Sequence, residues 1–199
     1  MSTSLQVSDL RFTEAARGNP IDLPFCNAIC AAANDLSSRS DLRAVLVTAE
    51  GKAFSYGGDI ANFVAKLDDL PAEIKRMTTT MHSAVARLQR MDAPVVVAVH
   101  GICAGGMTAF VAGCDVVVSA DSAKFAAAYT GIGYSCDAGS SVTVSRRMGL
   151  SRARQFFLRN QTLDAAAALQ AGLVDEVVRA DQVLPTAETI ALQLAAGPT

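Results

Sequence analysis

The stretch GICAGG, residues 101–106, has three glycines between an apolar run at 94–99 and a helix-like run at 107–114. Glycine has no Cβ, so a backbone that is rich in it can approach another group closely. A second stretch with paired glycines, FSYGGD at 54–59, follows another apolar run at 43–48. Both stretches therefore read as tight turns between a strand and a helix.

The segments around these loops alternate between strand-like and helix-like patterns. Apolar residues at helical spacing, several of them after a capping Asp, predict helices. Short runs rich in β-branched residues predict buried strands, and no linker or repeat interrupts the chain. The sequence therefore predicts an α/β fold with largely parallel strands, as a single domain over residues 1–199. The expected helices are 23–36, 60–67, 72–90, 107–114, 138–148, 151–159, 164–171 and one from about 182, and the expected extended segments are 43–48, 95–99, 115–120, 123–129 and 173–178.

Composition narrows the classes of function. The net charge is −2, and no cluster of Lys or Arg stands out, which argues against nucleic acid or an anionic membrane as a partner. No charged-then-apolar leader is visible at the N-terminus. Five cysteines without disulfide-framework spacing indicate small buried side chains in a reducing cytoplasm. With only two histidines, no metal site is expected.

The uncharged stretch 93–114 has the length of a membrane span, but Pro94, His100 and four glycines interrupt it. A buried strand, a turn and a buried helix fit it better. On the preceding expected helix, Met77 and Met81 belong to an apolar stripe that is interpreted as core.

In α/β folds, chemistry gathers in loops at the carboxyl ends of strands, and both glycine loops occupy that position. Each can offer a backbone N–H near a helix N-terminus, where negative charge is stabilised. Two such groups that converge would form an oxyanion hole, although the turns could also be merely structural. GICAGG does not match the dinucleotide-binding pattern, and neither a P-loop nor a nucleophile-elbow motif is present.

With both loops in view, the chain resembles the crotonase superfamily, the enoyl-CoA hydratase/isomerase fold, and this resemblance implies a spiral of ββα units. Four pieces carry this resemblance, in the family's order and spacing across about residues 17–180. They are RGNPID, DLRAVLVTAEGKAFSYGGDI, APVVVAVHGICAGGMTAFVAGCDVVVSADSAKF and MGLSRARQFFLRNQTLDAAAALQAGLVDEVV. The joint match is specific for the fold and for acyl-CoA binding, but much less so for the reaction.

The resemblance assigns roles to individual residues. Gly58 and Gly106 are similar to the two glycines whose N–H groups form the family's oxyanion hole around a thioester oxygen. Coenzyme A would be part of the substrate, so no separate cofactor is implied. The other residues implied to contact the acyl-CoA are Ala53, Ser55, Tyr56, Asp59, Ile60, Ala104, Gly105, Tyr129, Ile132 and Cys136.

The sequence departs from the family pattern at its acid–base residues. Hydratases of the family carry two glutamates, and the matching positions here are Ala109 and Tyr129. What remains is Asp137, which resembles the aspartate that some family isomerases use as a proton carrier. An apolar loop would raise its pKa toward the working range. The alternative is that Asp137 only caps a helix that starts at Ala138.

Three readings of function stay open. The leading one is an isomerase or hydratase-like lyase of fatty acid metabolism that uses Asp137. The second is an arylacyl-CoA dehalogenase, in which Asp137 attacks the ring and His82 activates water. The third is a catalytically weak acyl-CoA-binding or assembly subunit. The family also implies a homotrimer or hexamer, a longer N-terminal hairpin, and a helical segment beyond the point where this chain stops.

Overall fold

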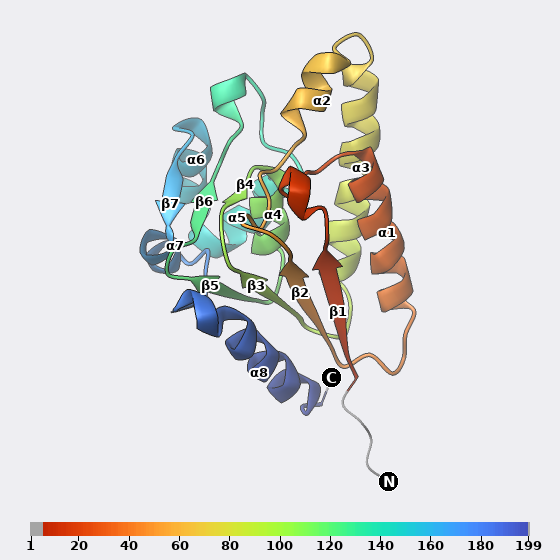
Figure 1. Ribbon diagram of the computed structural model, residues 1–199, viewed down its shortest axis with the longest axis vertical. Helices are drawn as coiled ribbons and strands as arrows, with labels where there is room; N and C mark the ends of the chain where they lie inside the picture. The colour runs from red at the N-terminus through yellow and green to blue at the C-terminus, as the bar shows by residue number, and fades with distance from the viewer. Residues whose placement is uncertain (1–5, 199) are drawn as a thin grey trace.

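This computed structural model describes residues 6–198. Strands rich in β-branched residues form its larger sheet. Five strands lie in the order β1-β2-β3-β5-β8, and every neighbouring pair is parallel (Figure 1). A smaller sheet has the order β4-β6-β7. The strands are β1 Val7–Phe12, β2 Ala44–Ala49, β3 Val95–Val99, β4 Cys103–Ala104, β5 Val116–Ala120, β6 Lys124–Ala126, β7 Thr162–Asp164 and β8 Glu176–Val178.

Helices cover the sheets on more than one side. Helix α8 packs against β2, β3 and β5, whereas α1 and α3 pack against each other as a separate pair (Figure 1). Parallel strands need such cover because both of their faces are buried. The helices are α1 Leu23–Ser37, α2 Ile60–Ala65, α3 Leu70–Leu88, α4 Gly106–Ala112, α5 Ser140–Met148, α6 Leu150–Leu158, α7 Ala165–Ala171 and α8 Val183–Ala195.

The predicted fold class is confirmed, and two predicted caps appear in the structure. The Asp22 carboxylate accepts a hydrogen bond from the Phe25 N–H at the start of α1. The Asp59 carboxylate accepts one from the Asn62 N–H at the start of α2. The helix predicted over 138–148 begins only at Ser140, because Ala138 and Gly139 have left-handed backbone conformations.

Sequence patterns missed three strands. Strand β1 lies at the edge of the sheet and is only partly buried, so polar residues interrupt its apolar pattern. Strand β4 has two residues and lies inside the stretch GICAGG. Strand β7 is also short and mostly exposed. Each lacks the long apolar run that marks a buried strand.

The uncharged stretch 93–114 forms the predicted strand β3 and helix α4, joined by a turn that contains the unpredicted β4, and most of it lies in the core. Within residues 6–198, no helix combines the length and the apolar character needed to cross a membrane. The five cysteines are unpaired, and three of them are buried.

Candidate active site

The two glycine loops touch each other through their backbones. Gly57 and Gly105 have φ values of +84° and +57°, which side-chain-bearing residues rarely adopt. A Cβ on Gly57 would lie 2.7 Å from the Ala104 carbonyl oxygen, closer than real Cβ atoms come. Gly57 is therefore required by this contact and Gly105 by its backbone conformation, and the joined loops place Gly58 and Gly106 along the same cavity.

A short ladder of hydrogen bonds joins the loops. The Ser55 N–H donates to the Ile102 carbonyl, and the Ala104 N–H donates to the Ser55 carbonyl, each at 3.0 Å. The Ser55 hydroxyl donates to the Asn19 carbonyl at 2.6 Å and accepts from the Gly57 N–H at 3.0 Å. Because Ser55 is fully buried, its side chain holds the loop and does not face the cavity.

The backbone N–H groups of Gly58 and Gly106 have no hydrogen-bond partner among the described residues. Both glycines line a cavity of about 600 Å³. Buried N–H groups almost always find a partner, so an N–H that lacks one beside a cavity is available to a ligand. This arrangement can accept an oxygen that gains negative charge.

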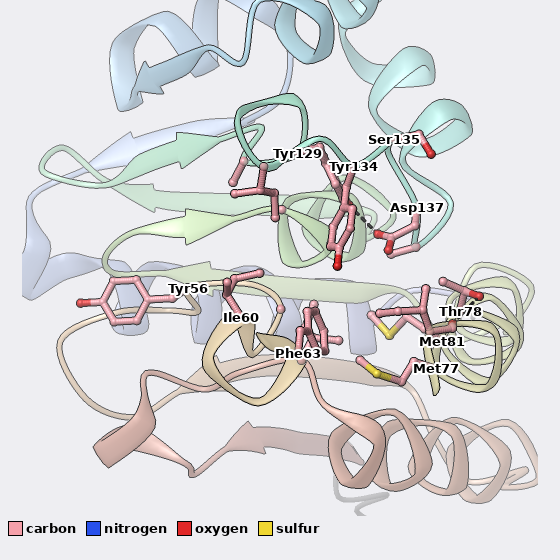
Figure 2. A pocket seen from close by; sticks show the side chains of 18 of the residues that line it. Tyr56, Ile60, Phe63, Met77, Thr78, Met81, Tyr129, Tyr134, Ser135 and Asp137 are labelled. Atoms are coloured by element: carbon pink, nitrogen blue, oxygen red, sulfur yellow. Dashed lines mark hydrogen bonds between the residues drawn. The ribbon is translucent and has the colours of Figure 1, made fainter. Parts of the chain in front are cut away.

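Two walls enclose the cavity (Figure 2). One wall comes from α2 and α3 and carries Ile60, Phe63, Met77 and Met81. The other comes from the segment 128–138 that joins β6 to α5. The remaining lining residues are Ile21, Cys26, Tyr56, Gly58, Ile74, Thr78, Gly105, Gly106, Ala128, Tyr129, Gly131, Ile132, Tyr134, Ser135, Asp137, Ala138 and Asn160.

Asp137 is the only carboxylate among the described residues that line this cavity. Its Oδ1 accepts a hydrogen bond of 2.7 Å from the Tyr129 hydroxyl and lies 3.5 Å from where a Cβ on Gly106 would stand. Helix α5 has Gly139 at its N-cap and no side-chain cap, so the expectation that Asp137 caps a helix is wrong. The carboxylate is instead directed at the cavity.

Burial raises the pKa of Asp137 above its ordinary value, since a desolvated carboxylate is less stable when charged. The Tyr129 hydroxyl and then the charge of His82 act in the opposite direction. Burial also raises the pKa of Tyr129 well above its usual range, so its hydroxyl stays protonated. The pair is thus a carboxylate with a permanent donor on one oxygen.

The structure separates the sequence-predicted site residues into two groups. Eight line the cavity: Asp137, Gly58, Gly106, Tyr56, Ile60, Gly105, Tyr129 and Ile132. The other predicted residues, which do not line it, are Ala53, Ser55, Asp59, Ala104, Cys136 and His82. Whether any of them contacts acyl-CoA stays a prediction.

Four of the predicted residues that do not line the cavity have other positions or roles in the structure. The Asp59 carboxylate caps α2 and also pairs with Arg17 at 3.1 Å, which ties α2 to the loop before α1. Ala53 and Ala104 are buried between the joined loops. The imidazole of His82 lies on an exposed part of α3, outside the cavity lining.

Several lining residues were not predicted for the site. Met77 and Met81 are buried, as the stripe on α3 predicts, but they also form a wall of the cavity. A helical stripe has the same pattern whether it covers core or cavity, so the sequence carried no signal for this role. Asn160 comes from the turn after α6, which no local pattern connects to the glycine loops.

Comparison with known proteins shows which family the chain belongs to. The family model described as enoyl-CoA hydratase/isomerase matches residues 3–199. The chain belongs to the enoyl-CoA hydratase/isomerase family. A crystal structure of an enoyl-CoA hydratase from Mycobacterium avium subsp. paratuberculosis superposes with a TM-score of 0.87 at 29% identity, over 98% of this chain and 77% of that one.

The chain is similar to members of the family that are named for different reactions. It is 30% identical to 4-chlorobenzoyl coenzyme A dehalogenase-2 of Arthrobacter, over 97% of this chain and 70% of that protein. It is 31% identical to 1,2-epoxyphenylacetyl-CoA isomerase of Escherichia coli, over 79% of this chain. The alignment spans 61% of that isomerase, less than two thirds of its length. Family membership is therefore shown, whereas one reaction is not singled out.

Proposed function

We propose that this chain is an acyl-CoA isomerase that moves a double bond through an enolate, with Asp137 as proton carrier. The observation that supports this most is the position of the Asp137 carboxylate, which lies beside Gly106 and is the only carboxylate among the described residues that line the cavity. A single carboxylate can take a proton from one carbon and return it to another. Hydration by two glutamates has no support, because Ala109 and Tyr129 occupy those positions.

In the proposed reaction, a carboxylate oxygen of Asp137 removes a proton from C2 of a 3-enoyl thioester. The electron pair of the broken C–H bond moves toward the thioester oxygen, which becomes an enolate oxygen. The N–H groups of Gly58 and Gly106 stabilise that charge more than they stabilise the neutral substrate. Asp137 then returns its proton to C4, which gives the 2-enoyl thioester and restores the carboxylate.

The acyl group in this proposal is apolar. Phe63, Ile74, Met77 and Met81 present carbon and sulfur to the cavity, and Asp137 is the only formally charged side chain in its described lining. A carboxylate on the acyl group of the substrate would find no basic partner in this cavity, and burial of an unpaired charge is costly. The flexible thioether side chains can adapt to acyl groups of different shape.

Arylacyl-CoA dehalogenation is the second candidate, supported by the similarity to the Arthrobacter enzyme and by the charge of His82 acting on Asp137. In that reaction the Asp137 carboxylate bonds to a ring carbon, halide leaves, and water hydrolyses the resulting aryl ester. The exposed position of His82, outside the cavity lining, disfavours it as the group that activates this water.

A His82→Ala variant separates the two enzyme readings. Under isomerisation we expect turnover within about twofold of wild type, because surface substitutions away from the site have small effects. Under dehalogenation the variant would stall and keep an aryl ester on Asp137. The measurement is turnover of 3-enoyl-CoA, 2-enoyl-CoA and 4-chlorobenzoyl-CoA, with intact-protein mass to detect the ester. No product from any of the three would favour a non-catalytic acyl-CoA-binding subunit.

We also propose a homo-oligomer, a trimer or hexamer as in the family. Four apolar side chains on α5, α6 and α7 are exposed in the single chain, namely Val142, Leu150, Leu158 and Leu169. Large exposed apolar side chains that recur on neighbouring helices are typical of an interface. Sedimentation at micromolar concentration should therefore give a mass several times that of the chain, and a single monomeric species would contradict the proposal.

A further inference from the structure

Tyr129 and Asp137 contact each other although seven residues separate them in the chain, and the helical structure between them is the single 3-10 turn Thr130–Ile132. The Tyr129 hydroxyl donates to Oδ1 of Asp137 at 2.7 Å, and both residues line the cavity (Figure 2). Among the described residues, Oδ2 of Asp137 has no hydrogen-bond partner. The two oxygens of this carboxylate are therefore not equivalent.

Unusual backbone conformations flank the pair. Four non-glycine residues in the described part of the chain have positive φ, namely Asn19, Ala128, Ala138 and Asn160. Ala128 directly precedes Tyr129, and Ala138 directly follows Asp137. Such conformations are unfavourable for residues with a Cβ, and they persist where the surrounding structure imposes them. Both alanines line the cavity, so the imposed turns lie at the site itself.

A third residue with positive φ also contacts the pair of Tyr129 and Asp137. Asn160, with φ +48°, accepts a hydrogen bond from the Tyr129 N–H through its side-chain oxygen at 3.1 Å. The Tyr129 ring packs edge-to-face against Phe157, with centroids 6.0 Å apart. Backbone and ring of Tyr129 are thus both held from α6 and the turn after it, and only the hydroxyl reaches Asp137.

We propose that Tyr129 is a positioning residue: its hydroxyl occupies Oδ1 of Asp137, so that Oδ2 alone gives and takes the proton. This inference rests on the proposed proton transfer and adds a residue to it. Tyr129 keeps its own proton throughout, since burial holds its pKa well above the usual range. The proton from substrate bonds to Oδ2 and leaves from Oδ2, while the hydrogen bond to Oδ1 fixes the plane of the carboxylate.

Other groups near Asp137 determine how its titration should be read. His82 on α3 acts on it through its charge, and lowers its pKa less than the Tyr129 hydroxyl does. Cys26 on α1 also lies near, but burial raises the pKa of its thiol to about 12, so it carries no charge at neutral pH. Ser140 on α5 also lies near the Tyr129 hydroxyl, but its own hydroxyl makes no hydrogen bond with the described residues. Tyr129 is therefore the main group that opposes the effect of burial on Asp137.

The decisive variant is Tyr129→Phe, which removes the hydroxyl and keeps the ring packed on Phe157. Loss of a donor that favours the charged carboxylate raises the pKa of Asp137 further. Because the ionised form of Asp137 accepts the proton, the acid limb of the pH profile of kcat/KM should move to higher pH. At the pH plateau, kcat should fall about 10- to 100-fold from the loosened carboxylate, with KM little changed.

Tyr134→Phe is the matched control, since it removes a hydroxyl from the same cavity without touching Asp137. Its acid limb should stay at the wild-type pH. In Asn160→Gly, the glycine tolerates the positive φ of this position, but the acceptor for the Tyr129 N–H is lost. This variant should shift the acid limb in the same direction as Tyr129→Phe, but less. An acid limb that stays in place in Tyr129→Phe would overturn the inference.

A readout without turnover keeps this inference separate from the proposed function. Carboxyl carbon resonances of labelled aspartate, with Asp137 assigned through its Asn variant, report the titration of Asp137 directly. Its pKa should be higher in Tyr129→Phe than in the wild-type protein. An unchanged titration contradicts the positioning role, even if the enzyme isomerises. A shifted titration without any isomerase turnover supports the role of Tyr129 and rejects the reaction instead.

Discussion

A Gly106→Pro variant is expected to lose about 100- to 1000-fold in kcat, because proline has no backbone N–H to stabilise the enolate oxygen. Gly106 is the first residue of α4, a position where proline is well tolerated in helices. The N–H that it would remove has no partner among the described residues, so no internal hydrogen bond is lost. Turnover with the best thioester of the screen measures the effect.

The matched control for this variant is Gly106→Ala, which keeps the N–H and adds only a Cβ. That atom would lie 3.0 Å from Ile21 Cδ1 and 3.3 Å from Ala138 Cβ, a tight fit that measures the steric part of the effect. Circular dichroism and thermal unfolding must show that both variants are folded. A folded Gly106→Pro protein as active as Gly106→Ala would exclude an oxyanion role for this N–H.

An Asp137→Asn variant is expected to lose about 100-fold or more in turnover, since an amide of the same shape cannot accept the proton. Acyl-CoA binding should remain nearly intact, because the glycine N–H groups and the apolar walls are unchanged. In the wild-type enzyme, kcat/KM should fall as pH drops through the pKa of Asp137. Burial raises that pKa, so the fall occurs at higher pH than for an ordinary aspartate.

The control for Asp137→Asn is Asp121→Asn, which neutralises an exposed carboxylate after β5, outside the cavity. This variant should turn over substrate at the wild-type rate. The general effect of removing a negative charge is then separated from the effect of changing Asp137. Isothermal titration with a non-reacting acyl-CoA checks binding in both variants. Unchanged turnover in Asp137→Asn would remove this residue from the mechanism and favour the non-catalytic reading.

Local sequence patterns were sufficient for most elements of the fold. Asp22 and Asp59 mark the starts of α1 and α2 because a carboxylate can satisfy the free N–H groups of a first helical turn. The valine-rich runs of β3 and β5 predict strands that are buried on both faces. Strand β4 escaped prediction because two residues carry no period, and its pairing depends on β6, about twenty residues away.

The two glycine loops illustrate where the sequence becomes ambiguous. Paired glycines after a strand indicate a tight turn, but the same pattern also occurs in turns without function. Their meaning depends on Ser55 pairing with Cys103, a contact between two loops far apart in the chain. The resemblance to the family implies only that the two loops meet at an oxyanion hole formed by Gly58 and Gly106, and not how their backbones pair.

By itself, the sequence determined the family, the α/β class, and the candidates Gly58, Gly106 and Asp137, because these features depend on residue types at fixed spacing. Only the tertiary structure decided that Asp137 faces a cavity rather than capping a helix, and that Tyr129 donates to its Oδ1. It also showed that Met77 and Met81, which are buried as the helical stripe predicts, form part of a cavity wall. The physical reason is that hydrogen bonds and cavities form between segments distant in sequence, whereas propensities and caps act within a few residues.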